Sequence, residues 1–342
     1  MKTRSTLKTI LAALLMTVGT AQAQTDVITL RVHHFLPPSS NAQAKFMEPW
    51  CAKVNKESAG RLKCQIYPAM QMGGTPPQLF DQAKDGVADI VWAVPGYQAG
   101  RFLVSEVFEL PFMGISGEKS SRAFWTYAMK NATEEYKGVR PIVFHVISGM
   151  AIHSTSKQVK TLADFKGLKL RAPTRMATRM VTAFGATPVP MPVPQVAESL
   201  SKGVVDAAMV PWEVVPTLKI QEIVKFHTET DPSMPLLSTT TFIFGMNPAK
   251  YESLPADLKK VIDANSGPDV SAWAGKVWDD ATLVARQTGI DRKNTFYTVP
   301  AAEVKNWQKA SESVAADWVK EVTAKGYDGQ RLLTEAKALL SH

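Results

Sequence analysis

The apolar residues of this chain gather in short runs, and longer segments of mixed polar and apolar residues separate them. Runs bounded by Gly, Pro or Asp are typical of strands buried on both faces. We predict strands at 28–35, 62–67, 90–95, 141–146, 168–172, 207–212 and 236–246. Helices are predicted at 41–58, 77–84, 175–183, 196–201, 256–264, 270–286 and 301–321. Alternation of strands and helices indicates an α/β fold.

A helix, a glycine turn and a buried strand follow one another in the same order at two places. The first copy ends in Gly86-Val87-Ala88-Asp89 and the strand at 90–95, and the second ends in Gly203-Val204-Val205-Asp206 and the strand at 207–212. Glycine provides the left-handed conformation that ends many helices. Ordinary αβ turns often look alike, which is the alternative explanation. Two such units favour two α/β lobes.

The chain is also too long for one hydrophobic core. Without the 23-residue leader described below, 319 of the 342 residues remain, and domains usually contain about 50–200 residues. We predict that residues 24–148 form lobe I, to which residues 237–276 return, and that residues 149–236 form lobe II. Residues 277–342 are predicted to be helices that pack on lobe II and across the hinge. The helix at 301–321, about 30 Å long, would span both lobes.

The first 23 residues have the pattern of an export signal. Three basic residues, Lys2, Arg4 and Lys8, precede an apolar run at 10–18. Ala21-Gln22-Ala23 then provides a cleavage site of small residues. Because the apolar run is too short to span a membrane, we expect cleavage after Ala23 and a periplasmic protein.

Charge and cysteine content narrow the choice of partners. Loss of the leader removes three positive charges, so the formal net charge falls from +8 to +5. Lys and Arg are scattered among acidic residues and do not cluster beside aromatic residues, which argues against nucleic-acid binding. The two cysteines, Cys51 and Cys64, favour a disulfide in an oxidising compartment; a pair of buried free thiols is the alternative.

The sequence lacks the common catalytic and cofactor motifs. It contains no His-Glu-x-x-His, Gly-x-Ser-x-Gly, Walker A or Gly-x-Gly-x-x-Gly pattern. His33 and His34 are neighbours on a predicted strand and therefore point to opposite faces, which argues against a two-histidine metal site. We expect no catalytic residue, no metal and no cofactor, and interpret the chain as a binding protein and not an enzyme.

Several motifs together resemble the TRAP-type (DctP-like) solute-binding proteins. The main one is Asp164-Phe165-Lys166-Gly167-Leu168-Lys169-Leu170-Arg171, and Gly185-Ala186-Thr187-Pro188 follows it. Tyr67-Pro68, Gly73-Gly74 and Glu109-Leu110-Pro111-Phe112 also fit. The matches therefore extend over most of the chain after the leader.

The resemblance implies both a fold and a mode of action. It implies a two-lobed periplasmic binding protein with a ligand cleft between the lobes, which delivers a small organic acid to the small and large membrane subunits of a TRAP permease. It also implies that Arg171 clamps the ligand, in agreement with the bidentate geometry of a guanidinium on a carboxylate. From residue type alone, Arg171 could equally form a structural salt bridge. An ABC-type binding protein for amino acids or sulfonates would share the fold and the compartment.

Departures from the family pattern bear on the ligand. Phe35 and Val210 stand where sugar-acid-binding members tend to have polar amides, and residues 149–153 lack the second arginine of those members. Aromatic residues near strand ends, where α/β folds build their clefts, add to an apolar lining. The candidate ligand-binding residues are Arg171, Trp212, Phe35, His34, Trp92, Tyr97, Val210 and Phe242. Each aromatic candidate could equally belong to the core of a lobe.

One arginine with an apolar lining favours an aromatic or branched 2-oxo or 2-hydroxy monocarboxylate as the ligand. A C4-dicarboxylate or a sugar acid is the alternative within the family. A periplasmic enzyme or a ligand-sensing module is the alternative from another class.

Overall fold

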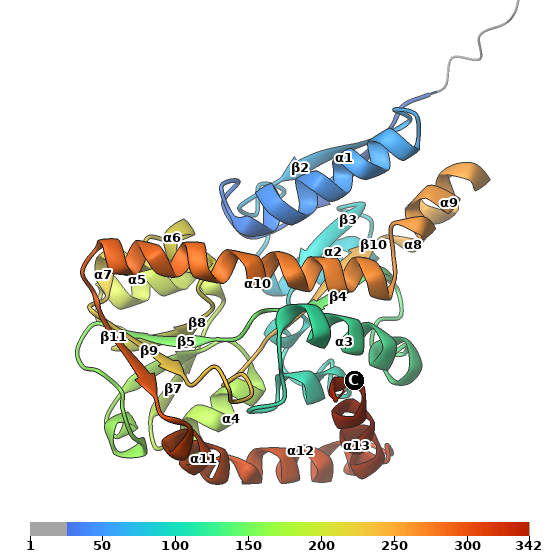
Figure 1. Cartoon of the computed structure of the whole chain (residues 1–342). Coiled ribbons are helices and arrows are strands. Elements are labelled where there is room, and N and C mark those ends of the chain that lie inside the picture. Colours follow the sequence, from blue (N-terminus) through green and yellow to red (C-terminus); the bar gives the residue numbers. More distant parts are fainter. Residues whose placement is uncertain (1–25, 342) are drawn as a thin grey trace, which may run out of the picture.

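The computed structural model describes residues 26–341, which form two mixed α/β lobes (Figure 1). Lobe I surrounds a five-stranded sheet of order β2-β1-β3-β10-β4, and lobe II a six-stranded sheet of order β11-β9-β5-β8-β6-β7. The predicted signal at 1–23 and its cleavage site lie outside the described residues. Within 26–341, no helix has the length and apolar character needed to cross a membrane.

The sheet of lobe I combines four strands that run in one direction with a single antiparallel strand, β10. Its strands are β1 (Ile28–His33), β2 (Leu62–Tyr67), β3 (Ile90–Ala93), β4 (Arg140–Val146) and β10 (Thr241–Met246). β10 is antiparallel to both β3 and β4, so the chain returns to this sheet after it has built lobe II. All residues of β3 and β10 are buried, which explains their continuous apolar runs. β10 begins at Thr241, later than the predicted start at 236.

Helices cover both faces of this sheet. They are α1 (Glu48–Glu57), α2 (Leu79–Lys84), α3 (Gly117–Asn131), α8 (Pro248–Glu252) and α9 (Ala256–Ala264). A π-helical segment, η1 (Ala42–Met47), precedes α1, and short 3-10 turns are η2 (Pro76–Gln78), η3 (Pro95–Tyr97) and η4 (Ser105–Glu109). Cys51 in α1 and Cys64 in β2 form a disulfide with their Cα atoms 5.8 Å apart.

Lobe II repeats the arrangement of lobe I and adds one edge strand. Its strands are β5 (Ala151–Ser154), β6 (Lys169–Ala172), β7 (Thr187–Pro190), β8 (Ala207–Val210), β9 (Phe226–Thr230) and β11 (Thr295–Val299). Its helices are α4 (Arg175–Ala183), α5 (Val196–Ser201), α6 (Val214–Thr217) and α7 (Ile220–Ile223), with 3-10 turns η5 (Leu162–Phe165) and η6 (Val193–Gln195). β7, β6 and β8 are parallel and β5 is antiparallel to β8, as β10 is to β3.

The two Gly-Val-x-Asp turns occupy equivalent places in the lobes. Oδ2 of Asp89, before β3, accepts a hydrogen bond of 2.8 Å from the main-chain N–H of Arg31 in β1. Oδ2 of Asp206, before β8, accepts one of 2.9 Å from the main-chain N–H of Lys169 in β6. The glycines of the turns have φ of 75° and 67°, and their carbonyls accept from the side chains of the same Arg31 and Lys169. Each turn thereby fixes the parallel pairing of the strand that follows it.

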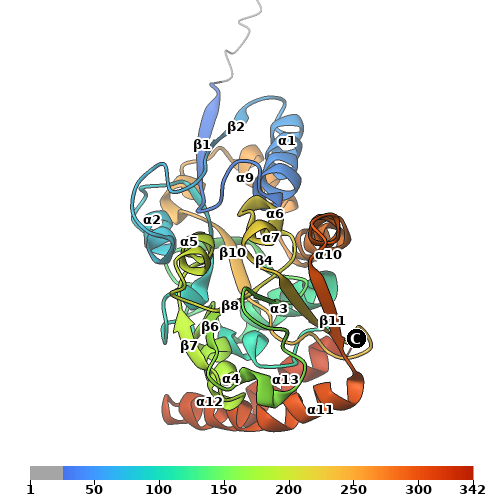
Figure 2. The ribbon, with the colours of Figure 1, turned by 90° about the vertical axis from the view of Figure 1, so that its left-hand side faces the viewer.

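The C-terminal helices connect the lobes. α10 (Pro268–Asp291) packs on α3 and β4 of lobe I and on α6 of lobe II, and Figure 1 shows it running across both. After β11 come α11 (Ala301–Ala310), α12 (Glu312–Ala324) and α13 (Gly329–Leu340). In Figure 2, α11 and α12 lie along the lower edge of the molecule; α12 packs on α4 of lobe II and α13 on α3 of lobe I.

The prediction of one continuous helix at 301–321 is wrong. α11 and α12 meet at Ser311, whose hydroxyl donates hydrogen bonds to the carbonyls of Trp307 and Gln308 at 3.0 and 3.1 Å. Serine side chains that bond the local main chain compete with regular helix formation. The long helix that spans both lobes is α10 instead.

Candidate ligand site

A small cavity of about 30 Å³ lies between the lobes. Three of its residues, Phe35, Pro173 and Pro211, follow closely after β1, β6 and β8, and ligands of open α/β sheets bind at these carboxyl ends. The full lining consists of Phe35, Leu36, Trp92, Tyr97, Ile147, Met150, Arg171, Pro173, Val193, Pro211, Glu213, Val214, Thr240 and Phe242. Most of these side chains are apolar, as in typical small-molecule sites.

Arg171 in β6 is the one basic residue of this lining, and it is 1% exposed. Its Nε and Nη2 donate to the carbonyl of Met191 at 3.1 and 2.9 Å, and its Nη1 donates to the carbonyl of Met209 at 2.7 Å. These bonds fix the plane of the guanidinium. A guanidinium has five N–H donors, so Tyr97 and a ligand can share the other two. Burial lowers the pKa of Arg171, and the neighbouring Tyr97 opposes that shift, whereas no Asp or Glu of the described residues does.

Tyr97 joins the two lobes beside Arg171. Its hydroxyl, at the end of η3 in lobe I, accepts a hydrogen bond of 3.0 Å from the main-chain N–H of Val193 in lobe II. Burial raises the pKa of Tyr97, and the nearby positive charge of Arg171 acts against that shift. The hydroxyl therefore stays protonated at neutral pH and keeps its own proton for donation.

Three rings form one side of the cavity, and we call Phe35, Trp92 and Phe242 the aromatic wall. Trp92 stacks on Phe35 with ring centroids 4.9 Å apart and on Phe242 with centroids 4.5 Å apart. The indole N–H of Trp92 donates to Nε2 of His145 at 2.8 Å, on the core side of the sheet. The polar edge of Trp92 is thus satisfied inside lobe I, and the wall offers apolar ring faces to the cavity.

Glu213, just before α6, is the one acidic residue of the lining. It is 8% exposed, and its Oε2 has no hydrogen-bond partner among the described residues. Burial raises the pKa of Glu213 to about 8, although the nearby Trp278 has an opposing effect. At neutral pH this carboxyl group is therefore mostly uncharged.

An ion pair also connects the lobes outside the cavity. Nε of Arg175, in α4 of lobe II, donates to Oε1 of Glu106, in η4 of lobe I, at 2.9 Å. Arg175 pairs in addition with Glu321 of α12. Glu106 is 4% exposed, and burial raises its pKa against the opposing effect of Arg175. Within residues 26–341, no three His, Cys, Asp or Glu side chains are grouped in a way that could hold a metal ion.

A family model described as bacterial extracellular solute-binding protein, family 7 (DctP), matches residues 32–321. The chain belongs to this family. Family 7 proteins bind substrates, so the predicted class of protein and the predicted two-lobed fold are both confirmed.

Solved structures of family 7 proteins resemble this one over nearly its whole length. A TRAP solute-binding protein from Rhodoferax ferrireducens T118, in complex with copurified benzoate, is 46% identical, covers 92% of this chain and 98% of its own, and has a TM-score of 0.91. A marine metagenome protein specific for aromatic acid ligands, with 3-hydroxybenzoate, is 44% identical over the same shares, with a TM-score of 0.90. A protein from Bordetella bronchiseptica with bound (R)- and (S)-mandelate is 28% identical over 92% of this chain and 99% of its own, with a TM-score of 0.84.

The structure brings five of the eight predicted ligand-binding residues together. They come from both lobes and line one cavity: Arg171, Phe35, Trp92, Tyr97 and Phe242. The family 7 signature around β6 therefore places its arginine opposite aromatic residues from lobe I.

Two of the other predicted residues face lobe II and do not line the cavity. The indole N–H of Trp212 donates to Oε1 of Glu229 at 2.8 Å, and its ring stacks on Phe296 in β11. Val210 is fully buried in β8, where its carbonyl is hydrogen-bonded to Nε2 of His153. Packing within the lobe II sheet directs both residues away from the ligand site.

His34 also lies outside the lining. Its Nε2 is 2.9 Å from Oε1 of Gln43, and its Nδ1 accepts a hydrogen bond from the main-chain N–H of Leu36. Burial lowers the pKa of His34 to about 4. Both ring nitrogens are therefore hydrogen-bonded close to the turn after β1. The ring of His34 packs edge-on against Trp92.

Sequence reasoning missed Glu213 and the apolar residues of the connections between the lobes. Glu213 directly follows Pro211-Trp212 at the end of β8. An acidic residue directly after a buried strand is a pattern that could have indicated a residue of the ligand site. Ile147, Met150 and Thr240 lie on the two connections, which have no periodic pattern of apolar residues.

Proposed function

We propose that this protein binds an aromatic monocarboxylate between its lobes and delivers it to the small and large membrane subunits of a TRAP permease. The supporting observation is the guanidinium of Arg171, which is 1% exposed, is oriented by three hydrogen bonds to main-chain carbonyls and has no Asp or Glu partner among the described residues.

A buried cation of this kind favours an anionic ligand. Removing a charged group from water costs several kcal/mol unless an opposite charge and hydrogen bonds compensate. The three carbonyl contacts of Arg171 compensate in part and hold the group rigid. A carboxylate would supply the missing charge and accept a charge-assisted hydrogen bond from the guanidinium.

The remainder of the cavity favours an aromatic ring over a second charged group or a cluster of sugar hydroxyls. The aromatic wall can stack on a ring, which contributes about 0.5–1.5 kcal/mol beyond the burial of its area. Among the lining residues Arg171 is the only basic one, so a second carboxylate or a sugar hydroxyl cluster would find few partners. The similar proteins that were crystallised with benzoate, 3-hydroxybenzoate and mandelate support the same choice.

Delivery to a permease requires that the lobes open and close. Because Arg171 is almost fully buried in this structure, a carboxylate reaches it when the lobes separate, and the ligand then favours the closed form by binding it better.

We further propose that the protein is exported to the periplasm with loss of residues 1–23. We also propose the lobe boundaries predicted above. Lobe I consists of residues 24–148 and 237–276, lobe II consists of residues 149–236, and residues 277–342 pack on lobe II and across the hinge.

A ligand panel tests this function. The mature protein, freed of copurified ligand by unfolding and refolding, would be titrated calorimetrically with benzoate, 3-hydroxybenzoate, mandelate, 3-methyl-2-oxobutanoate, succinate and glucuronate. We expect the aromatic acids to bind at least 100-fold more tightly than succinate or glucuronate. At 100 times its Kd, such a ligand adds about 2.7 kcal/mol to the stability of the fold, which a thermal melt detects. Tighter binding of succinate or glucuronate would instead favour the dicarboxylate or sugar-acid alternative.

A further inference from the structure

Glu213 lies at the cavity with a hydrogen bond to Trp278 but without a charged partner among the described residues. It lines the cavity with Arg171 and the aromatic wall, yet it pairs with no basic side chain of the described residues. Its Oε2 is buried and has no hydrogen-bond partner there. A buried carboxyl oxygen without a partner is destabilising, so its retention at a ligand cavity points to a contact with the ligand.

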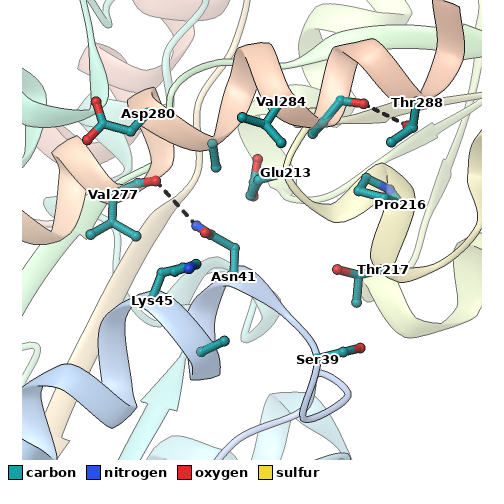
Figure 3. Close-up of a pocket in the computed structure, with 13 residues that line it drawn as sticks. Ser39, Asn41, Lys45, Glu213, Pro216, Thr217, Val277, Asp280, Val284 and Thr288 are labelled. Atoms are coloured by element: carbon teal, nitrogen blue, oxygen red, sulfur yellow. Dashed lines mark hydrogen bonds between the residues drawn. The ribbon is translucent and has the colours of Figure 1, made fainter. Parts of the chain in front are cut away.

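The same residue separates the cavity from a second hollow. Figure 3 shows Glu213 between Asn41, the residue before η1, and Val284 of α10, within a hollow of about 550 Å³ that η1, α6 and α10 surround. We call this space the outer hollow. Glu213 lines both spaces, and therefore lies at the boundary of the cavity that faces the outer hollow.

Arg171 and Glu213 come from different elements, β6 and the segment before α6, and share no ion pair. A ligand whose carboxylate binds Arg171 therefore presents another part of its structure to Glu213. A carboxyl group that is uncharged when buried can both donate and accept a hydrogen bond. A hydroxyl group would satisfy it, whereas a second carboxylate in a site of low dielectric would be disfavoured.

We propose that Glu213 is a specificity-determining residue that hydrogen-bonds a hydroxyl substituent of the aromatic acid and excludes a second negative charge. This inference rests on the proposed function, because it assigns the part of the ligand that Arg171 does not hold. It makes the preferred ligand a hydroxylated aromatic monocarboxylate.

The test compares three proteins with four ligands. Wild type, Glu213→Met and Glu213→Gln would be titrated with benzoate, 3-hydroxybenzoate, 4-hydroxybenzoate and benzene-1,3-dicarboxylate at pH 6.5. We expect wild type to bind one hydroxybenzoate about tenfold more tightly than benzoate. Glu213→Met should lose this preference, so that it binds benzoate and the hydroxybenzoates with similar affinity. Glu213→Gln keeps a donor and an acceptor and should keep the preference.

A pH series provides a second, independent readout. Burial raises the pKa of Glu213 to about 8, and a bound anion raises it further, so the carboxyl group is protonated in the complex. Affinity for benzoate should therefore fall as pH rises from 6.5 to 9.5 in wild type and stay level in Glu213→Gln. Glu135→Gln is the matched control, because Glu135 also has a pKa raised by burial to about 7 but lies outside the cavity; its pH profile should follow wild type.

Three results would overturn the assignment. The first is an equal loss of affinity for benzoate and the hydroxybenzoates in Glu213→Met. The second is a wild type that prefers neither hydroxybenzoate over benzoate. The third is an affinity for benzoate that depends on pH in the same way in wild type and Glu213→Gln. Thermal melts without ligand identify a variant that fails to fold. If Glu213→Met does not fold, the ligand preference and the pH series of Glu213→Gln test the assignment of Glu213. If wild type binds no aromatic acid at all, the proposed function fails, and this inference fails with it.

Discussion

Main-chain carbonyls, and not acidic side chains, orient the guanidinium of Arg171. Met191 and Met209 contribute these carbonyls, which orient the guanidinium without neutralising it. An acidic partner would compete with a carboxylate ligand, whereas a carbonyl leaves the positive charge available. The geometry of one residue thus provides both the orientation and the charge of the site.

Replacement of Arg171 by lysine should separate charge from geometry. Arg171→Lys keeps a positive charge but offers a point charge in place of a planar fork, and it cannot keep three fixed contacts while holding a carboxylate bidentately. We expect affinity for the best aromatic acid to fall about 10- to 100-fold, measured by calorimetry. Arg179→Lys is the control, since Arg179 pairs with Glu321 outside the cavity. Wild-type affinity in Arg171→Lys would show that the carboxylate binds elsewhere.

Among the elements, the turn before each central strand is the unit that both lobes share. Asp89 and Asp206 make the same contact to the neighbouring parallel strand, and this is why the Gly-Val-x-Asp pattern in the sequence indicated two lobes correctly. Most of the predicted strands and helices are present. One error, the continuous helix at 301–321, lies where the side chain of Ser311 interrupts a periodic pattern between α11 and α12.

The disulfide between α1 and β2 stabilises an element that contributes nothing to the ligand site. No residue of α1 or β2 belongs to the cavity lining. Replacing Cys51 and Cys64 together by serine should lower the free energy of unfolding by about 3 kcal/mol in the chain-entropy model, measured by urea denaturation. Affinity for the aromatic acid should be unchanged. A large loss of affinity with little loss of stability would contradict this separation of roles.

At the scale of the whole molecule, contacts between the lobes decide whether the cavity is closed. The hydroxyl of Tyr97 meets the main chain of Val193 at the cavity, and Arg175 meets Glu106 outside it. These contacts form only when the lobes come together, so they add to the stability of the closed form.

Removal of the charge on Glu106 should shift the molecule toward the open form. In Glu106→Gln, Arg175 keeps its second partner Glu321, so no buried cation is left without a counterion. We expect affinity for the aromatic acid to fall about three- to tenfold, and the radius of gyration without ligand to rise in small-angle X-ray scattering. Arg179→Gln, which removes an ion pair between α4 and α12 and leaves Glu106 untouched, should change neither quantity. Identical behaviour of the two variants would argue against a role of this ion pair in closure.

The sequence by itself determined the α/β class, the two lobes and the arginine of the site. Buried parallel strands require continuous apolar runs, turns require glycine at positive φ, and the family motif places Arg171 at the end of β6. All of these are local signals that short segments of sequence contain.

Only the tertiary structure decided which residues face the ligand. Strands buried on both faces carry apolar side chains on each face of the sheet. The sequence therefore does not distinguish Trp92 from Trp212, although Trp92 lines the cavity and Trp212 packs inside lobe II. The same holds for Glu213. Its uncharged state at neutral pH follows from burial between segments far apart in the chain, and burial is a property of the packed molecule.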